Sequence, residues 1–77
     1  NQMKAFNIAK EGAKRLDYGS FYTLGVLYEF GGSSIKKDPK LSSENYINAL
    51  NLGSLSAKFR LGINYEIPFR YSSYLLL

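Results

Sequence analysis

The side chains of this sequence that could take part in chemistry are those of two glutamates and two basic residues. They lie in or next to two segments of similar sequence. Glu29 and Glu66 follow matching stretches, and paired carboxylates are one arrangement used in general acid–base catalysis. Lys58 and Arg60 lie close to Glu66 in sequence and could attract anions or pair with these acids. The chain contains no histidine and no cysteine, so it lacks the usual neutral-pH base and any thiolate ligand. We therefore expect a protein that is not an enzyme, with no metal and no cofactor, in which the basic residues pair with acids.

The composition of the chain limits which partners and which membrane segments we expect. Ten Lys and Arg against six Asp and Glu give a net charge of +4, which suits acidic partners such as anionic lipid headgroups or nucleic acid and does not select between them. No apolar run is long enough for a transmembrane helix, and nothing resembles a signal peptide. The sequence starts at Asn1 without a methionine, so we expect a processed chain or a piece of a longer one.

Residues 55–67 would position the basic residues and Glu66. Apolar and non-apolar residues alternate through this segment without a break. Strand side chains alternate between two faces, so the pattern predicts a strand with one apolar face. At roughly 3.3 Å per residue the segment spans about 43 Å, or about 30 Å when tilted near 45°, which matches a bilayer core.

Residues 20–30 are the second predicted strand. They are rich in aromatic residues and stop at Gly31 and Gly32, which indicates a strand followed by a turn. Thr23–Phe30 aligns with Arg60–Ile67, and both contain a polar residue, Leu-Gly, two residues, Tyr-Glu and an apolar residue. The match predicts two strands in equivalent surroundings.

The remaining segments are less distinctive. We predict a polar loop for residues 31–54, with a short strand or helix at 46–52. We predict a helix or a strand, followed by a turn, for residues 1–19. Residues 71–77 are predicted to begin a further strand. The expected fold is all-β, with antiparallel strands forming part of a transmembrane β-barrel and a short N-terminal helix.

A family resemblance supports the same interpretation. Arg60–Ile67 resembles the β-signal of outer-membrane β-barrel proteins, in which a polar residue and a glycine precede two apolar residues that flank one position. Thr23–Phe30 fits the pattern as well, and the general style of the sequence is similar to that of porin-family barrels of Bacteroidota. The resemblance implies a strand recognised by the barrel-insertion machinery, in a fragment or partial chain.

The barrel interpretation assigns side chains to surfaces. The predicted lipid-facing residues are Tyr22, Leu24, Val26, Tyr28, Phe30, Phe59, Leu61, Ile63, Tyr65 and Ile67. The predicted lumen-facing residues are Lys58, Arg60, Asn64 and Glu66. Lys36, Lys37 and Lys40 are candidate lipopolysaccharide contacts.

The expected function is a non-catalytic outer-membrane β-barrel component that serves transport, anchoring or assembly of a membrane complex. Its partners would be membrane lipids and lipopolysaccharide, the remaining strands of the barrel or identical subunits, and other envelope proteins, without nucleic acid. The expected localisation is the outer membrane of a Gram-negative bacterium. Two alternatives stay open: a membrane anchor like that of trimeric autotransporters, and a small soluble basic β module that binds nucleic acid.

Overall fold

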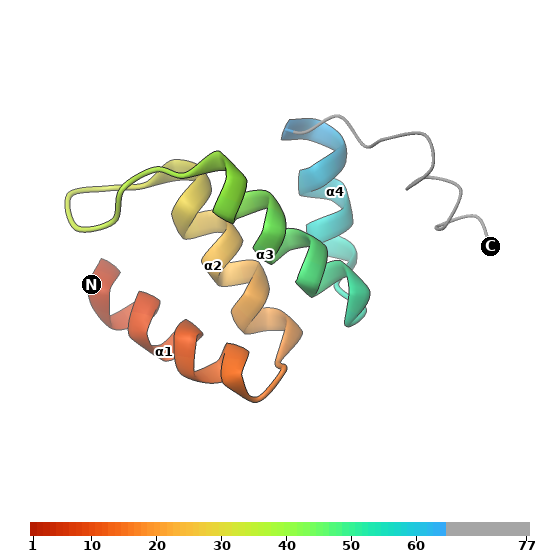
Figure 1. The fold of residues 1–77 in the computed structure, drawn as a ribbon, viewed down its shortest axis with the longest axis horizontal. Coiled ribbons are helices and arrows are strands. Elements are labelled where there is room, and N and C mark those ends of the chain that lie inside the picture. The colour runs from red at the N-terminus through yellow and green to blue at the C-terminus, as the bar shows by residue number, and fades with distance from the viewer. Residues whose placement is uncertain (65–77) are drawn as a thin grey trace.

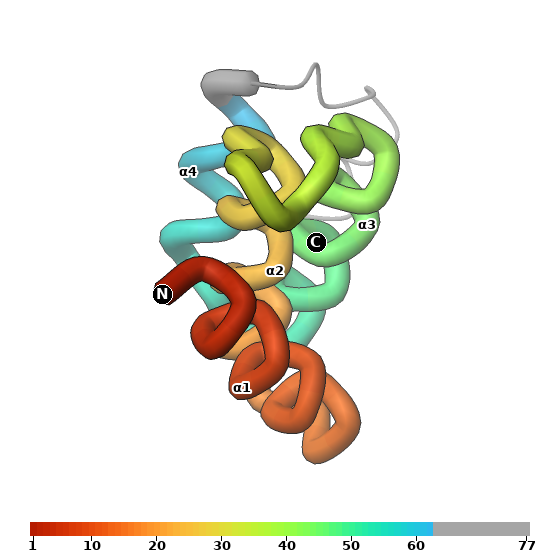
Figure 2. The backbone as a smooth tube through the Cα atoms, turned by 90° about the vertical axis from the view of Figure 1, so that its left-hand side faces the viewer, coloured from red at the N-terminus to blue at the C-terminus, as the bar shows by residue number. Residues whose placement is uncertain are grey.

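The computed structural model describes residues 1–64, which form two helical hairpins. α1 (Gln2–Lys14) and α2 (Tyr18–Phe30) make the first hairpin, and α3 (Pro39–Asn51) and α4 (Leu55–Asn64) make the second. Each helix packs against the next one in the chain, so that α2 lies between α1 and α3 (Figure 1). Figure 2 looks along this row from the α1 end, with α4 behind. The described part of the protein is all-α.

This architecture corrects the predicted fold. The strand predicted at 20–30 lies within α2, and the strand predicted at 55–67 is α4 as far as Asn64. The predicted loop 31–54 contains α3, which also covers 46–51. Since residues 1–64 contain no strand, the β-barrel, the trimeric anchor and the small β module are all wrong, as are the resemblance to porin-family barrels and the transmembrane strands. The strand predicted at 71–77 lies outside the described residues.

The alternating pattern of 55–64 has a helical explanation. A series of apolar residues at every second position contains two interleaved series at every fourth position, and residues four apart share one side of a helix. Ala57 and Leu61 form one series and are buried, whereas Leu55 and Phe59 form the other and are 77% and 66% exposed. The period of burial is therefore helical, and the second apolar series stands on the opposite side of α4.

The aromatic segment 20–30 is a helix because it lies at the centre of the row. A helix that is apolar on all sides is buried on all sides. Leu24 is buried, and Phe21, Tyr22 and Val26 pack against the core formed by α3 and α4. On the other side, Tyr28 meets Phe6 of α1 edge to face, with ring centroids 5.8 Å apart. Neighbouring helices thus outweigh the strand preference of these aromatic residues.

The ends of the helices are specified locally. The side chains of Asn1 and Asp38 accept hydrogen bonds from the backbone N–H groups of Lys4 and Leu41, at 2.8 and 3.0 Å. Such caps satisfy donors that the first helical turn leaves unpaired.

The two hairpins repeat at an interval of 37 residues. α1 and α3 begin at Gln2 and Pro39, and α2 and α4 begin at Tyr18 and Leu55, which is the same separation in both cases. Asn1 and Asp38, which cap α1 and α3, are also 37 residues apart, and so are the three-residue turns 15–17 and 52–54. The middle residue of each turn, Leu16 or Gly53, has a positive φ of 58° or 108°. The sequence likeness of 23–30 and 60–67 is therefore part of a repeat of whole hairpins.

Small residues let the helices approach one another. A Cβ placed on Gly12 of α1 would lie 2.7 Å from the Cβ of Ser20 in α2, so this crossing requires glycine. The equivalent crossing of the second hairpin pairs Ala49 with Ala57, which are both fully buried. None of the helices in residues 1–64 is long and apolar enough to cross a membrane.

Candidate functional site

A polar cluster joins the two hairpins. Glu29 of α2 accepts a hydrogen bond of 2.5 Å from the hydroxyl of Tyr46 in α3. Arg60 of α4 donates to both carboxylate oxygens of Glu29, from Nη2 at 2.7 Å and from Nε at 3.3 Å. Three helices therefore meet at one carboxylate, and the two-point geometry of the arginine fixes their relative positions.

The surroundings of this cluster hold its members in one protonation state. Burial, followed by the hydrogen bond to Glu29, raises the pKa of Tyr46 well above its ordinary value. The hydrogen bond to Glu29 likewise raises the pKa of Arg60. The guanidinium also lies over the ring of Phe30, at 5.2 Å from the centroid. Because the phenol keeps its proton and the arginine its charge near neutral pH, these two groups suit a structural joint better than proton transfer.

Tyr46 occupies a seat on α2 made by Tyr22, Gly25 and Glu29, here called the α2 seat. The rings of Tyr22 and Tyr46 are 5.6 Å apart. A Cβ on Gly25 would lie 2.5 Å from Tyr46 Cδ1, so only glycine admits the ring. One turn earlier on α3, buried Ser42 donates a 2.7 Å hydrogen bond to the carbonyl oxygen of Gly25. The α2 seat thus receives both the tyrosine and the serine of an approaching helix.

The 37-residue interval places the same residue types on α4. Phe59 corresponds to Tyr22, and Gly62 corresponds to Gly25. The ring of Phe59 is 66% exposed, and a Cβ on Gly62 would have no heavy atom within 4 Å among the described residues. Glu66 corresponds to Glu29 in sequence and lies outside the described residues. Residues 1–64 therefore contain one seat that is filled and one that is open.

A hollow of about 380 Å³ is lined by residues of α1, of α2 and of the turn between them. Its walls include Ala5, Ala9, Ser20 and Thr23. These are the counterparts, 37 residues earlier, of Ser42, Tyr46, Ala57 and Arg60, which contact α2 or complete the core beside it. The first hairpin therefore presents the surface with which the second hairpin covers α2, but with short side chains in place of tyrosine and arginine.

The predicted lipid-facing residues occupy several environments. Tyr22, Val26 and Tyr28 are half-buried, Leu24 and Leu61 are buried, and Phe30 and Phe59 are exposed. The side chains of Ile63 and Asn64, and the residues Tyr65, Glu66 and Ile67, lie outside the described part.

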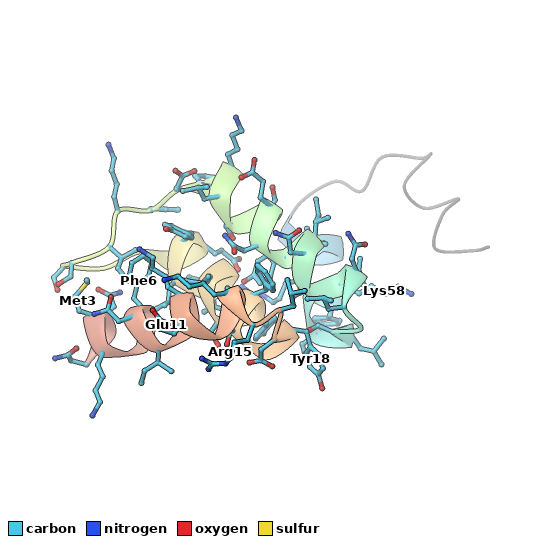
Figure 3. All side chains as sticks on the ribbon, turned by 60° about the horizontal axis from the view of Figure 1, so that its bottom comes forward. Met3, Phe6, Glu11, Arg15, Tyr18 and Lys58 are labelled. Carbon is cyan, nitrogen blue, oxygen red and sulfur yellow. The ribbon has the colours of Figure 1, made fainter. Side chains whose placement is uncertain are left out.

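The predicted polar residues also separate. Arg60 pairs with Glu29, as expected for the basic residues, although the pair joins two helices. Lys58 is exposed on the outer side of α4 (Figure 3). Lys36, Lys37 and Lys40 are exposed in the loop between the hairpins and at the start of α3, and their contact with lipopolysaccharide stays a prediction.

Sequence reasoning missed Tyr46 and Ser42. Tyr46 lies in the segment 46–52, for which the sequence predicts either a strand or a helix, and Ser42 lies in the predicted polar loop 31–54. Their spacing of four residues, which places both on one side of a helix, was the available signal.

Within residues 1–64, no group of three or more acidic side chains is placed to hold a metal ion. Comparison of the chain with protein-family models, with curated proteins and with solved structures finds no match.

Proposed function

We propose that this chain is a pair of units from an α-helical repeat array and that it works as a non-catalytic scaffold for binding other proteins. The observation that carries the proposal is the 37-residue interval shared by helix starts, caps and positive-φ turns. Helical repeats bury their apolar faces by stacking on neighbours, so a stacking face that none of residues 1–64 covers is available to a partner helix.

The hollow between α1 and α2 is the proposed binding surface. Its counterpart on the second hairpin already covers a helix, namely α2. Ile8 stands at the rim of the hollow with 61% of its surface exposed. Short side chains at Ala5 and Ala9 leave room for the larger residues of an incoming helix. An apolar helix from a partner protein is therefore the occupant that this surface suits best.

Two observations support a role without catalysis. The sequence lacks histidine and cysteine, and the half-buried carboxylate of Glu29 accepts hydrogen bonds from Tyr46 and Arg60. The outer-membrane localisation and the lipid, lipopolysaccharide and envelope-protein partners stay predictions. They were inferred from strands, and the helical hairpins lend them no further support.

Site-specific photo-crosslinking in the source cell tests this proposal. A benzophenone amino acid at position 8 should give discrete adducts with protein. The same group at position 7, where exposed Asn7 lies on another side of α1, is the matched control and should not give those adducts. Adducts with lipid or RNA alone, or identical adducts from both positions, would contradict a protein-binding hollow.

A further inference from the structure

The loop between the two hairpins is held in place by the first turn of α1. The side-chain amide of Gln2 donates a 2.9 Å hydrogen bond to the carbonyl oxygen of Gly31 and accepts one of 3.3 Å from the backbone N–H of Ser34. Within the loop, the N–H of Gly32 bonds to the carbonyl oxygen of Ile35 at 2.9 Å, and the side chain of Ile35 is buried. The loop is therefore anchored both to α1 and to the interior of the protein.

This anchored loop and the start of α3 carry exposed positive charge. The exposed residues, here called the loop lysines, are Lys36, Lys37 and Lys40. None of them forms an ion pair with another residue of 1–64. The carboxylate of Asp38, the acid nearest to them in sequence, accepts the hydrogen bond that caps α3. Residues 65–77 contain one acid, Glu66, which is too few to balance three lysines. The surface therefore has an excess of positive charge.

The position of the loop keeps it clear of the faces by which helical hairpins stack. Figure 1 shows the loop at the ends of α2 and α3, whereas hairpins stack through the sides of their helices. In helical repeats the loops on one face of the array often bind the partner. We propose that the loop lysines, held in place by Gln2, bind a segment of another protein that is rich in aspartate and glutamate. The inference rests on the proposed scaffold function but uses a surface separate from the hollow.

The composition of the loop favours an acidic protein over other polyanions. Residues 31–41 contain no aromatic ring on which the base of a single-stranded nucleic acid could stack. Basic clusters that bind anionic membranes contain about four to eight Lys or Arg residues, and this one contains three. The one large apolar side chain of 31–38, that of Ile35, is buried and is not available to insert into lipid. An acidic protein segment needs neither a stacking ring nor an inserted side chain.

Oligoglutamate is the probe, because it supplies carboxylates without apolar or aromatic groups. It is titrated at physiological ionic strength into the isotope-labelled full chain and followed by NMR. We expect saturable shifts at the amides of residues 33–40 and none at Ile8, which lines the hollow. An RNA oligomer of equal charge and vesicles rich in phosphatidylserine are the competing polyanions. Absence of oligoglutamate binding, or tighter binding of either competitor, would overturn the proposal.

Two triple variants of equal net charge separate the loop lysines from the overall charge of the chain. Replacing the loop lysines with glutamine should weaken oligoglutamate binding by at least about tenfold. The matched control removes exposed charges near the turns, at the other end of the helices, through Lys14→Gln, Arg15→Gln and Lys58→Gln. It should keep the affinity within about twofold. Equal weakening in both variants would mean that net charge alone attracts the probe, and would contradict a site in the loop.

Gln2→Ala tests the anchored conformation without changing any charge. It removes both hydrogen bonds to the loop, so amide exchange at Ser34 should quicken and oligoglutamate affinity should fall by about threefold or more. Faster exchange with unchanged affinity would show that Gln2 does not position the loop lysines for binding. Crosslinking at position 8 does not depend on the loop lysines, so failure of the loop and failure of the scaffold function are distinguishable.

Discussion

The helices of the two hairpins begin 37 residues apart, and both turns pass through a residue of positive φ, but different residues stand where the helices cross. Gly12 and Ser20 meet in the first hairpin, and Ala49 and Ala57 meet in the second. Each pair consists of small side chains, and neither position is identical between the hairpins. The comparison teaches that the repeated unit is defined by side-chain size and spacing, so the identity between the two halves can be low while their geometry coincides.

The two hairpins also differ in the length of the side chains at the surface between their helices. Ala9 and Thr23 leave a hollow in the first hairpin, whereas their counterparts Tyr46 and Arg60 reach across to Glu29 in the second. Long polar side chains thus convert a receptive surface into a joint. Four experiments test this comparison.

Tyr46→Ala should have the largest effect, because it gives the second hairpin the residue of the first. Loss of a fully buried aromatic ring should lower the free energy of unfolding by about 3–5 kcal/mol. Urea denaturation followed by circular dichroism measures this loss. Tyr18→Ala removes a tyrosine that is 53% exposed and should cost far less. Equal costs would mean that Tyr46 does not hold the hairpins together.

Alanine at the two equivalent glycines should act in opposite directions. Gly25→Ala pushes a methyl group into the Tyr46 ring and should destabilise the fold by about 1–3 kcal/mol. The Cβ of Gly62→Ala meets no heavy atom of residues 1–64 within 4 Å, so this variant should stabilise the helix by up to about 1 kcal/mol. Thermal melts of both variants beside the wild type give the two signs. If both variants were destabilised, the open space at Gly62 would be wrong.

Alkaline pH should weaken the joint between the two hairpins. The raised pKa of Tyr46 means that the folded state holds the phenol proton more tightly than the unfolded state, whose tyrosine pKa is about 10. Stability is therefore complete below that pH and falls as the pH rises beyond it. Tyr46→Phe should cost about 1.5–3 kcal/mol at neutral pH and flatten this alkaline decline. Parallel alkaline declines in both proteins would remove the titration of Tyr46 as the cause.

Leu16→Gly should have the smallest effect, since it gives the first turn the residue of the second. Leu16 holds a φ of 58°, a region that penalises side chains, and it is 68% exposed, so little packing is lost. We expect a gain of about 0.5–1 kcal/mol in unfolding free energy. The reverse change, Gly53→Leu, should destabilise the protein. A destabilised Leu16→Gly variant would show that the exposed leucine makes contacts that outweigh its strain.

The sequence contained the repeat but not its secondary structure. Leu24-Gly25 and Leu61-Gly62 were visible as copies, whereas the alternation across residues 55–64 suited both a strand and two interleaved helical series. The exposure of the individual side chains distinguishes the strand pattern from the helical one, and this exposure depends on where α3 packs against α4. The pairing of Arg60 with Glu29 was foreseeable from charge, but the role of Tyr46 was not, because it depends on a glycine that is distant in sequence.

The central position of α2 has a consequence for synthesis on the ribosome. α2 leaves the exit tunnel before α3, so Tyr22, Gly25 and Val26 emerge without the residues that later cover them. The nascent first hairpin therefore displays an apolar, strand-prone surface until Tyr46 follows. Such surfaces attract chaperones or other nascent chains, and the short loop between the hairpins limits how long this one stays uncovered.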